Sequence, residues 1–256
     1  METFPFGMPV LPLVQKEKNC RQIFVLGVYA SAVHARWIDP KGRTVINALA
    51  VASEPEIFWR GDNAQEIVES ISVPEQAGRL TASDKQLNGP SGRALDRQFL
   101  EPLGVNRNDT WLCDLLPVSR MNPNQAKALA RAYAPRMQEW DLPCYDLPPV
   151  PNELASPERR LEIEGEVRKA HPSIFITLGD KPLQWFTRYF GSKGRLSAYG
   201  ESTKEYGQLH DIRIADIDMK LLPLVHPRQA GALGAHSDKW RSLHSFWTEK
   251  VAPVLL

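Results

Sequence analysis

The side chains that could do chemistry follow the ends of short apolar runs. Asp114 interrupts WLCDLLPV, Glu54 follows ALAVAS, and His226 follows KLLPLV. An ionised carboxylate accepts hydrogen bonds, and an imidazole can donate one to charge that develops on a leaving group. Two further runs end in glycine, at Gly27 and at Gly179, and the stretch after Gly27 contains no acid as far as Trp37. The pattern indicates a site built at strand ends, with its acid displaced from the first strand.

Strands that alternate with helices must position these residues. Short β-branched runs bounded by Gly or Pro are typical of buried strands, and apolar residues at helical spacing after a capping residue are typical of helices. We predict strands at 22–29, 44–51, 109–119, 173–179, 212–217 and 220–227 and helices at 63–73, 91–104, 122–140, 157–171, 180–191 and 237–251. Asn63 and Ser156 are the predicted caps, and the stretch from Gly27 to Trp37 is predicted as a loop.

This alternation of strands and helices predicts a mainly parallel sheet with helices on both faces. In such sheets ligands bind beyond the carboxyl ends of the strands. The residues expected there are Gly27, Val28, Tyr29, Glu54, Pro55, Phe58, Trp59, Asp114, Arg120, Asn122, Gly179, Asp180, His226, Pro227 and Arg228.

Composition sets few limits on function. The chain has 256 residues, enough for one sizeable α/β domain or two small ones, with 43% hydrophobic and 24% charged residues. The net charge of +1 gives no global reason to expect nucleic acid, but a local basic groove would not show in this sum. Three separated cysteines suit reduced thiols, the start lacks a signal peptide, and no run is long enough to span a membrane. We expect a cytoplasmic protein.

The familiar cofactor and nucleophile signatures are absent from the sequence. There is no G-x-G-x-x-G, no P-loop, no G-x-S-x-G and no H-E-x-x-H. The His and Cys residues do not cluster as metal ligands do. We therefore expect neither a cofactor nor a metal.

Five motifs occur in a defined order instead. They are LGVYASAVHARW, GPSGRALDRQFLEPLG, WLCDLLPVSRMNP, ITLGDKPLQWF and LLPLVHPRQAG, between residues 23 and 231. This set resembles the uracil-DNA glycosylase superfamily, in which a Gly ends the first strand, a polar residue ends a middle strand and a His-Pro-Ser-type loop comes late. The second and third motifs are most similar to the branch that carries an iron–sulfur cluster. The resemblance implies a three-layer α/β/α sandwich around a short, mostly parallel sheet.

The sequence departs from this family at four places. The cluster branch needs four cysteines at set positions, which are missing, so we expect no iron–sulfur cluster. The first motif offers Val28, Tyr29 and Ala30 where several members place a water-positioning acid or Asn. Asp114 stands where Asn usually meets the uracil edge, and Arg228 replaces the usual Ser after His226-Pro227.

The resemblance implies that Asp114 reads a flipped base. An Asn amide suits uracil because it donates and accepts, whereas a carboxylate only accepts and would pair with an exocyclic amine such as cytosine N4. An amino base such as a cytosine or adenine is therefore expected, the alternative being an Asp that caps a turn. His226 would stabilise the departing base, the alternative being a structural histidine.

The other roles that the resemblance implies are assigned less directly. Glu54 is the first substitute for the water-positioning acid and Asp180 the second, and Tyr29 would hold the water or shape the site. Phe58 and Trp59 would stack on the base, or pack in the core, and Gly27 and Val28 would line it. The expected phosphate contacts are Arg36, Arg93, Arg120, Lys127 and Arg228. Lys181 is expected on a helix surface, which favours hydrolysis without lyase activity.

Together these expectations describe one domain over 1–256, with residues 1–20 as an N-terminal extension. The expected protein is a monomeric DNA glycosylase that hydrolyses the N-glycosidic bond of a damaged or modified base, with DNA as its partner and no membrane association. Two alternatives stay open, because fold does not fix function. One is an inactive member that binds DNA or a nucleobase, and the other is a hydrolase of small nucleosides.

Overall fold

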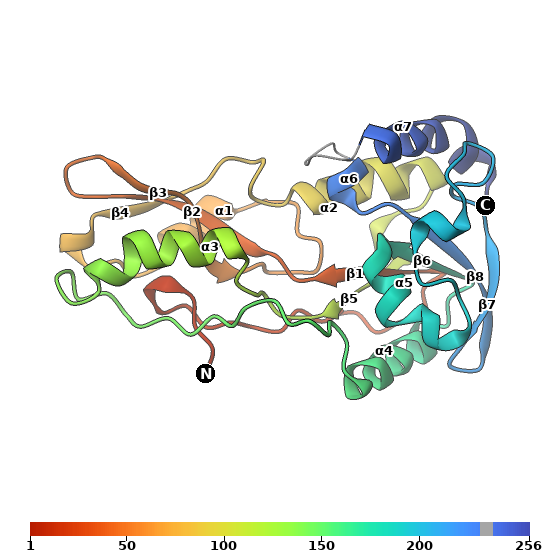
Figure 1. The fold of residues 1–256 in the computed structure, drawn as a ribbon, viewed down its shortest axis with the longest axis horizontal. Coiled ribbons are helices and arrows are strands. Elements are labelled where there is room, and N and C mark those ends of the chain that lie inside the picture. The colour runs from red at the N-terminus through yellow and green to blue at the C-terminus, as the bar shows by residue number, and fades with distance from the viewer. Residues whose placement is uncertain (231–237) are drawn as a thin grey trace. The chain divides into compact units, whose positions relative to one another are not determined.

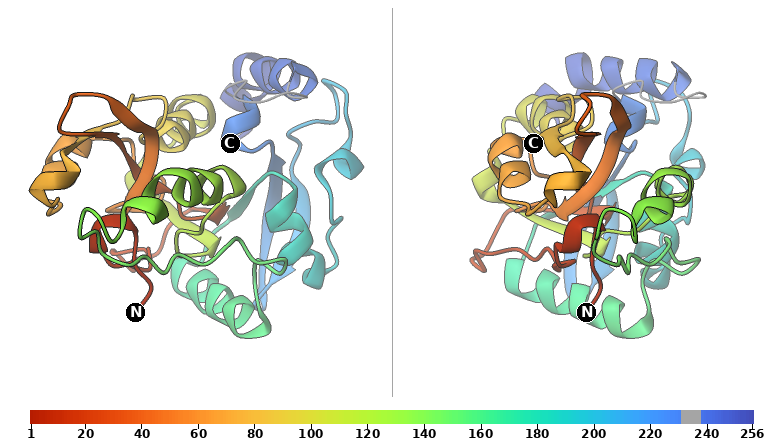
Figure 2. Two further views of the ribbon diagram at one scale, coloured as in Figure 1. Left: turned by 60° about the vertical axis from the view of Figure 1, so that its left-hand side comes forward. Right: turned by 90° about the vertical axis from the view of Figure 1, so that its left-hand side faces the viewer.

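The computed structural model describes residues 1–230 and 238–256, and the chain falls into two compact units (Figures 1 and 2). The parallel-sheet unit contains Val14–Tyr29, Ser91–Pro117 and Glu153–Leu256, and the antiparallel-sheet unit contains Met1–Leu13, Ala30–Pro90 and Val118–Asn152. Each unit is thus assembled from three separate stretches of the chain. The assignment of 1–256 to one domain stays a prediction.

The parallel-sheet unit is built on a five-stranded sheet with the order β5-β1-β6-β8-β7. The strands are β1 (Ile23–Tyr29), β5 (Thr110–Leu116), β6 (Ile174–Leu178), β7 (His210–Ile214) and β8 (Ile217–Leu224). β1 pairs in parallel with β5 and β6, β6 pairs in parallel with β8, and β7 forms an antiparallel hairpin with β8. The prediction of an α/β protein with a mostly parallel sheet is confirmed.

Helices flank this sheet. α4 (Pro157–Ala170) directly precedes β6, and α5 (Asp180–Trp185) follows β6 directly. α2 (Pro90–Ala94), α6 (Pro227–Ala230) and α7 (Asp238–Phe246) lie above the strands in Figure 1, and α4 lies below them. This arrangement is compatible with the expected three-layer sandwich.

The helix boundaries follow local signals in the sequence. The Ser156 hydroxyl accepts a hydrogen bond from the Arg159 N–H, 3.3 Å away, and so caps α4 as predicted. α2 continues through a π-helical turn (Leu95–Leu100) and a 3-10 turn (Glu101–Leu103) to Gly104, where the predicted helix ends. Ser237, the predicted start of the last helix, and Gly231, the end of the last motif, lie outside the described residues.

Stacked aromatic rings form one face of the parallel-sheet core. The rings of Phe24 and Phe175, on neighbouring strands, stack with centroids 4.9 Å apart. Trp111 stacks on the other side of Phe24 at 6.3 Å, and Phe186 extends the row at 5.8 Å from Phe175. All four side chains are almost fully buried, which ties β5, β1 and β6 to the helices on this face.

The antiparallel-sheet unit contains a sheet that the sequence did not lead us to expect. Its strands are β2 (Ala32–Ile38), β3 (Thr44–Ser53) and β4 (Arg79–Ala82), in the order β3-β2-β4. The prediction of a loop between Gly27 and Trp37 is therefore wrong. Val33, Ala35 and Trp37 are buried and alternate with more exposed residues, which is the pattern of a half-buried strand.

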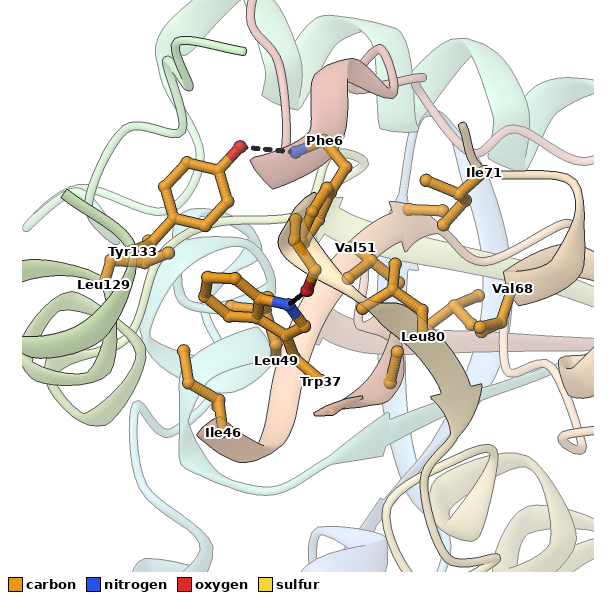
Figure 3. Packing of buried hydrophobic residues seen from close by; sticks show 14 of the residues in the cluster. Phe6, Trp37, Ile46, Leu49, Val51, Val68, Ile71, Leu80, Leu129 and Tyr133 are labelled. Atoms are coloured by element: carbon orange, nitrogen blue, oxygen red, sulfur yellow. Dashed lines mark hydrogen bonds between the residues drawn. The ribbon is translucent and has the colours of Figure 1, made fainter. Parts of the chain in front are cut away.

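Helical segments cover this smaller sheet. α1 (Ala64–Glu69) begins after Asn63, which occupies the cap position but makes no side-chain cap hydrogen bond. α3 (Pro123–Ala128) continues through π-helical and 3-10 turns to Arg136. The core between them joins distant segments (Figure 3): the Tyr133 hydroxyl accepts from the Phe6 N–H at 2.9 Å, and Trp37 Nε1 donates to the Ala77 carbonyl at 2.8 Å.

No helix in the part of the chain that the structure describes combines the length and the apolar character needed to cross a membrane.

Candidate functional site

The carboxyl ends of the parallel strands bring four of the predicted residues to one edge of the sheet. Asp114 of β5 is paired in register with Gly27 of β1. Gly179 follows β6, and its N–H donates to the Leu224 carbonyl of β8 at 2.8 Å, two residues before His226. With strands about 4.8 Å apart, the ends of β5 and β8 are separated by roughly 14 Å. The acid and the imidazole therefore flank two glycines along this edge.

Asp114 is a buried carboxyl group with only 5% of its surface exposed. Burial raises the pKa of Asp114 to about 7, while Arg159 opposes this shift and Glu166 adds to it. Both protonation states are therefore populated near neutral pH. The protonated acid donates and accepts, as an amide does, and the carboxylate only accepts. The expectation of an amino base assumes the ionised form of Asp114, and burial adds the neutral form.

His226 is held as a neutral imidazole with a defined tautomer. Burial, followed by the positive charge of Arg228, lowers the pKa of His226 to about 4. The Arg228 N–H donates to Nδ1 of His226 at 3.1 Å, so the ring proton lies on Nε2. His226 thus keeps one N–H donor over the whole physiological pH range. A neutral donor of this kind can stabilise charge that appears on a leaving group.

Gly179 makes the close approach of the β6 and β8 ends possible. Its φ of +85° lies in the region that glycine adopts most easily, and a Cβ added there would stand 3.1 Å from Cβ of His226. The sequence predicted this glycine at a strand end. The structure adds the reason, which is that a larger residue would press on Cβ and the main chain of His226.

A buried hydrogen-bond chain stands behind His226. The Val225 N–H donates to the Tyr206 hydroxyl at 3.1 Å, and that hydroxyl lies 2.8 Å from Nδ1 of His244. Nε2 of His244 is 3.0 Å from the Gln98 carbonyl, which can only accept. His244 therefore donates from Nε2, and the Tyr206 hydroxyl donates to its Nδ1. Burial lowers the pKa of His244 to about 4, which keeps this chain intact at neutral pH.

Sequence reasoning missed the side chains that support the site. Arg159 of α4 donates to main-chain carbonyl oxygens at the end of β5, and Tyr206 and His244 support the end of β8. None stands in a motif or at a strand end. Their roles depend on the packing of α4 and α7, so no sequence signal marks them.

Several predicted site residues lie in the antiparallel-sheet unit, among them Glu54, Phe58 and Trp59. Glu54 does follow a strand, β3, and is buried with 6% exposure. However, β3 belongs to the antiparallel sheet, so the expectation that Glu54 ends a strand of the parallel sheet is wrong. Trp59 is 3% exposed and packs in the core of this unit, which leaves little of its ring for stacking on a base.

The predicted phosphate contacts are distributed over both units. In the antiparallel-sheet unit, Arg120 pairs with Glu2 at 2.5 Å and Arg36 bonds the Asn47 amide oxygen at 3.0 Å. Lys127 is exposed on α3. In the parallel-sheet unit, Arg93 is partly buried in α2 and Arg228 is exposed.

The remaining predicted residues of the parallel-sheet unit are placed as follows. Val28 is partly buried, and Tyr29, the last residue of β1, is 39% exposed. Asp180 accepts from the Leu196 N–H at 2.8 Å, so this carboxylate is already engaged in a loop contact. Lys181 is exposed on α5, as predicted. Among the residues described, no group of three or more His, Cys, Asp or Glu side chains is placed to hold a metal ion.

Comparison of the chain with protein-family models and with curated proteins found no match. The candidate site therefore rests on its geometry and on the order of its motifs.

Proposed function

We propose that this protein hydrolyses the N-glycosidic bond of a flipped base in DNA, and that its fold is of the uracil-DNA glycosylase type. The observation that supports this most is the placement of Asp114 and the neutral His226 at one edge of the parallel sheet, on either side of Gly27 and Gly179. A base reader and a leaving-group donor are the two functions that base excision requires.

In the proposed reaction, water attacks C1′ of the sugar as the bond between C1′ and the base nitrogen breaks. The bonding electrons leave with the base, and Nε2–H of His226 donates a hydrogen bond to the charge that develops there. The water oxygen becomes the new hydroxyl on C1′, and its proton passes to solvent or to the departing base. A preorganised donor of this kind typically contributes about a hundredfold to a thousandfold in rate.

Asp114 then determines which base is accepted. As a carboxylate it accepts from an exocyclic amine, as on cytosine or adenine. As a neutral acid it also matches an edge that combines a carbonyl with an N–H, as on uracil. Because the pKa of Asp114 is about 7, we expect amino bases to gain preference as the pH rises and uracil-like bases to gain preference as it falls.

A panel of DNA substrates tests this function. Duplexes and single strands carrying uracil, hypoxanthine, adenine and modified cytosines, including bulky ones, are incubated with the protein and then nicked with alkali. Asp114→Asn and His226→Ala are run beside the wild type, with Lys181→Ala as a control on an exposed helix position. Excision that depends on His226 but not on Lys181 supports hydrolysis. A protein that cleaves no member of the panel would refute the proposed activity.

The end of β1 favours one alternative, a protein that binds a base without cleaving it. Val28, Tyr29 and Ala30 supply no carboxyl group there, and Asp180 is already engaged. Tight binding to abasic DNA without excision would support this alternative. A hydrolase of free nucleosides would ignore the DNA substrates and release base from nucleosides alone.

A further inference from the structure

Arg159 makes the most extensive polar contacts of any side chain near the end of β5. Only 12% of its side chain is exposed. Nη2 donates to the Asp114 carbonyl at 2.8 Å and to Sγ of Cys113 at 3.2 Å, and Nε donates to the Leu115 carbonyl at 3.2 Å. The guanidinium of α4 thus holds three consecutive residues of β5, 44 to 46 positions away in the chain.

The position of β5 explains why these contacts matter. β5 is an edge strand of the parallel sheet, and within residues 1–230 and 238–256 it pairs with β1 alone. The free side of β5 has no neighbouring strand, so a carbonyl oxygen there would lose its partner without Arg159 in a largely buried place. The guanidinium presents its N–H donors in a fixed plane, as a fork that can satisfy two carbonyl groups at once, whereas a lysine ammonium is a single point of donors on a flexible stem.

The other side of the guanidinium is neutralised by two acids of its own helix. Nη1 donates to Glu162 at 2.9 Å and to Glu166 at 3.3 Å. Glu166 is in turn fixed by the Trp111 indole, whose Nε1 donates to it at 2.8 Å. Arg159 therefore donates a hydrogen bond to the main-chain carbonyl of Asp114, and its charge is balanced by Glu162 and Glu166 instead of by the Asp114 carboxyl group.

We propose that Arg159 is a positioning residue for Asp114, one that fixes the end of β5 and so determines which base edge the Asp114 carboxyl group meets. The part that concerns base choice rests on the proposed function above. The part that concerns position and charge does not, because it describes the protein without substrate.

The electrostatic surroundings of Asp114 come from the same helix. Arg159 lowers the pKa of Asp114 and Glu166 raises it, and burial outweighs both. The two charges that act on Asp114 therefore belong to one ion pair of α4. Removing either partner should move the pKa of Asp114 in a known direction, upward without Arg159 and downward without Glu166.

If Arg159 only stabilised the fold, the results would differ. Its substitution would then lower thermal stability but would leave the titration of Asp114 and the choice of base unchanged. The neighbouring Arg160 provides a matched control on the same helix. Its side chain is 15% exposed, pairs with Glu153, donates to the Ala155 carbonyl and lies over the Tyr189 ring, and none of these partners belongs to β5.

The experiment compares Arg159→Lys, Arg159→Gln, Glu166→Gln and the control Arg160→Lys in the full-length protein. The carboxyl carbon NMR signal of Asp114, assigned by its loss in Asp114→Asn, is titrated without substrate. We expect Arg159→Gln to raise the midpoint by about one unit and Glu166→Gln to lower it by about as much, since removing a unit charge that acts on a buried carboxyl group has an effect of this size. Arg160→Lys should leave the midpoint unchanged.

Amide hydrogen exchange tests the positioning directly. In Arg159→Lys the positive charge is kept but the fork is lost, so exchange at the end of β5 should accelerate about tenfold, the size of one to two lost hydrogen bonds. Arg160→Lys should not change it. If excision occurs, Arg159→Lys should also reduce the ratio of rates between the best and the next base, whereas Arg160→Lys should preserve it.

The outcomes separate the two proposals. Unchanged midpoints in both Arg159→Gln and Glu166→Gln, or unchanged exchange in Arg159→Lys, would overturn the role of Arg159. If the arginine variants do not fold, the Glu166→Gln midpoint decides alone, because Gln still accepts the Trp111 hydrogen bond. A wild type that excises no base would refute the proposed function but leave both NMR measurements valid.

Discussion

The main-chain N–H of Arg228 lies 3.1 Å from Nδ1 of His226 and donates a hydrogen bond to it. Since a neutral imidazole has one ring proton, this bond assigns that proton to Nε2. Burial works in the same direction, because it lowers the pKa of His226 to about 4. The ring is therefore a hydrogen-bond donor that does not depend on protonation at neutral pH.

The first prediction concerns the pH dependence that His226 imposes. An ordinary histidine required in its neutral form would lose activity below about pH 6.5. For His226 we expect no such loss until the pH approaches the lowered pKa of about 4. Single-turnover excision rates between these values provide the measurement, on a base whose binding does not change with Asp114 protonation. A fall in the excision rate centred near the ordinary histidine pKa, present in the wild type and absent in His226→Gln, would contradict the prediction.

The second prediction concerns Trp59, which sequence reasoning placed beside a flipped base. The ring is 3% exposed and packs with the core of the antiparallel-sheet unit. We expect Trp59→Phe to lower the free energy of unfolding by about 1–3 kcal/mol, because a smaller ring leaves space in a packed core. Chemical denaturation measures this loss, with the exposed Lys41→Ala as a control. Affinity for abasic DNA should remain within about twofold of wild type, and a much larger drop at unchanged stability would restore the stacking role.

The parallel sheet could be predicted because its signals are local. Each of its buried strands is a short apolar run that ends in a polar residue or glycine, as at Asp114 and Gly179. Their order along the chain then placed Asp114 and His226 at the same edge. Parallel pairing follows from helices between the strands, so both residues were found without any knowledge of contacts.

The antiparallel sheet could not be predicted by the same reasoning. β2 follows β1 after only two residues, Ala30 and Ser31, and its polar face was interpreted as a site loop. The alternation of Val33, Ala35 and Trp37 is the sequence signal that indicates this strand. Once β2 is a strand, β3 pairs with it, and Glu54 at the end of β3 no longer belongs to the edge that holds Asp114. One missed strand thus assigned Glu54 to the wrong sheet.

The supporting network was beyond sequence reasoning for a different reason. Tyr206 and Val225 are 19 residues apart in the chain, and Tyr206 and His244 are 38 residues apart. Buried hydrogen bonds between distant segments depend on how helices pack, and residue type alone does not indicate them.

The third prediction tests that network. Tyr206→Phe removes a buried hydroxyl that accepts from Val225 and donates to His244, leaving both partners unsatisfied. We expect a loss of about 1–3 kcal/mol in the free energy of unfolding. We also expect a lower excision rate without a change in substrate affinity, because Val225 directly precedes His226. Tyr189→Phe is the control, since Tyr189 is 57% exposed. Equal stability of the two variants would show that the hydroxyl contributes nothing.

The fourth prediction concerns the free energy of unfolding, which the ionisation of Asp114 lowers. Burial raises the pKa of this carboxyl group to about 7 from an unfolded value near 3.8. A buried acid with a raised pKa binds its proton more tightly in the folded state, so its ionisation destabilises the fold as the pH rises through this window. Asp114→Asn cannot ionise and has nearly the same shape.

We therefore expect Asp114→Asn to match the wild type only below the unfolded pKa near 3.8 and to exceed it by roughly 4 kcal/mol about one unit above neutral pH. Thermal unfolding at both pH values measures the difference, with Asp218→Asn as a control, since the Asp218 side chain is 82% exposed. In excision assays the same variant should lose the pH dependence of base choice and prefer uracil-like bases over amino bases by about tenfold to a hundredfold. Complete loss of excision on every base would instead identify Asp114 as the general base that activates water, a role that its pKa of about 7 also suits.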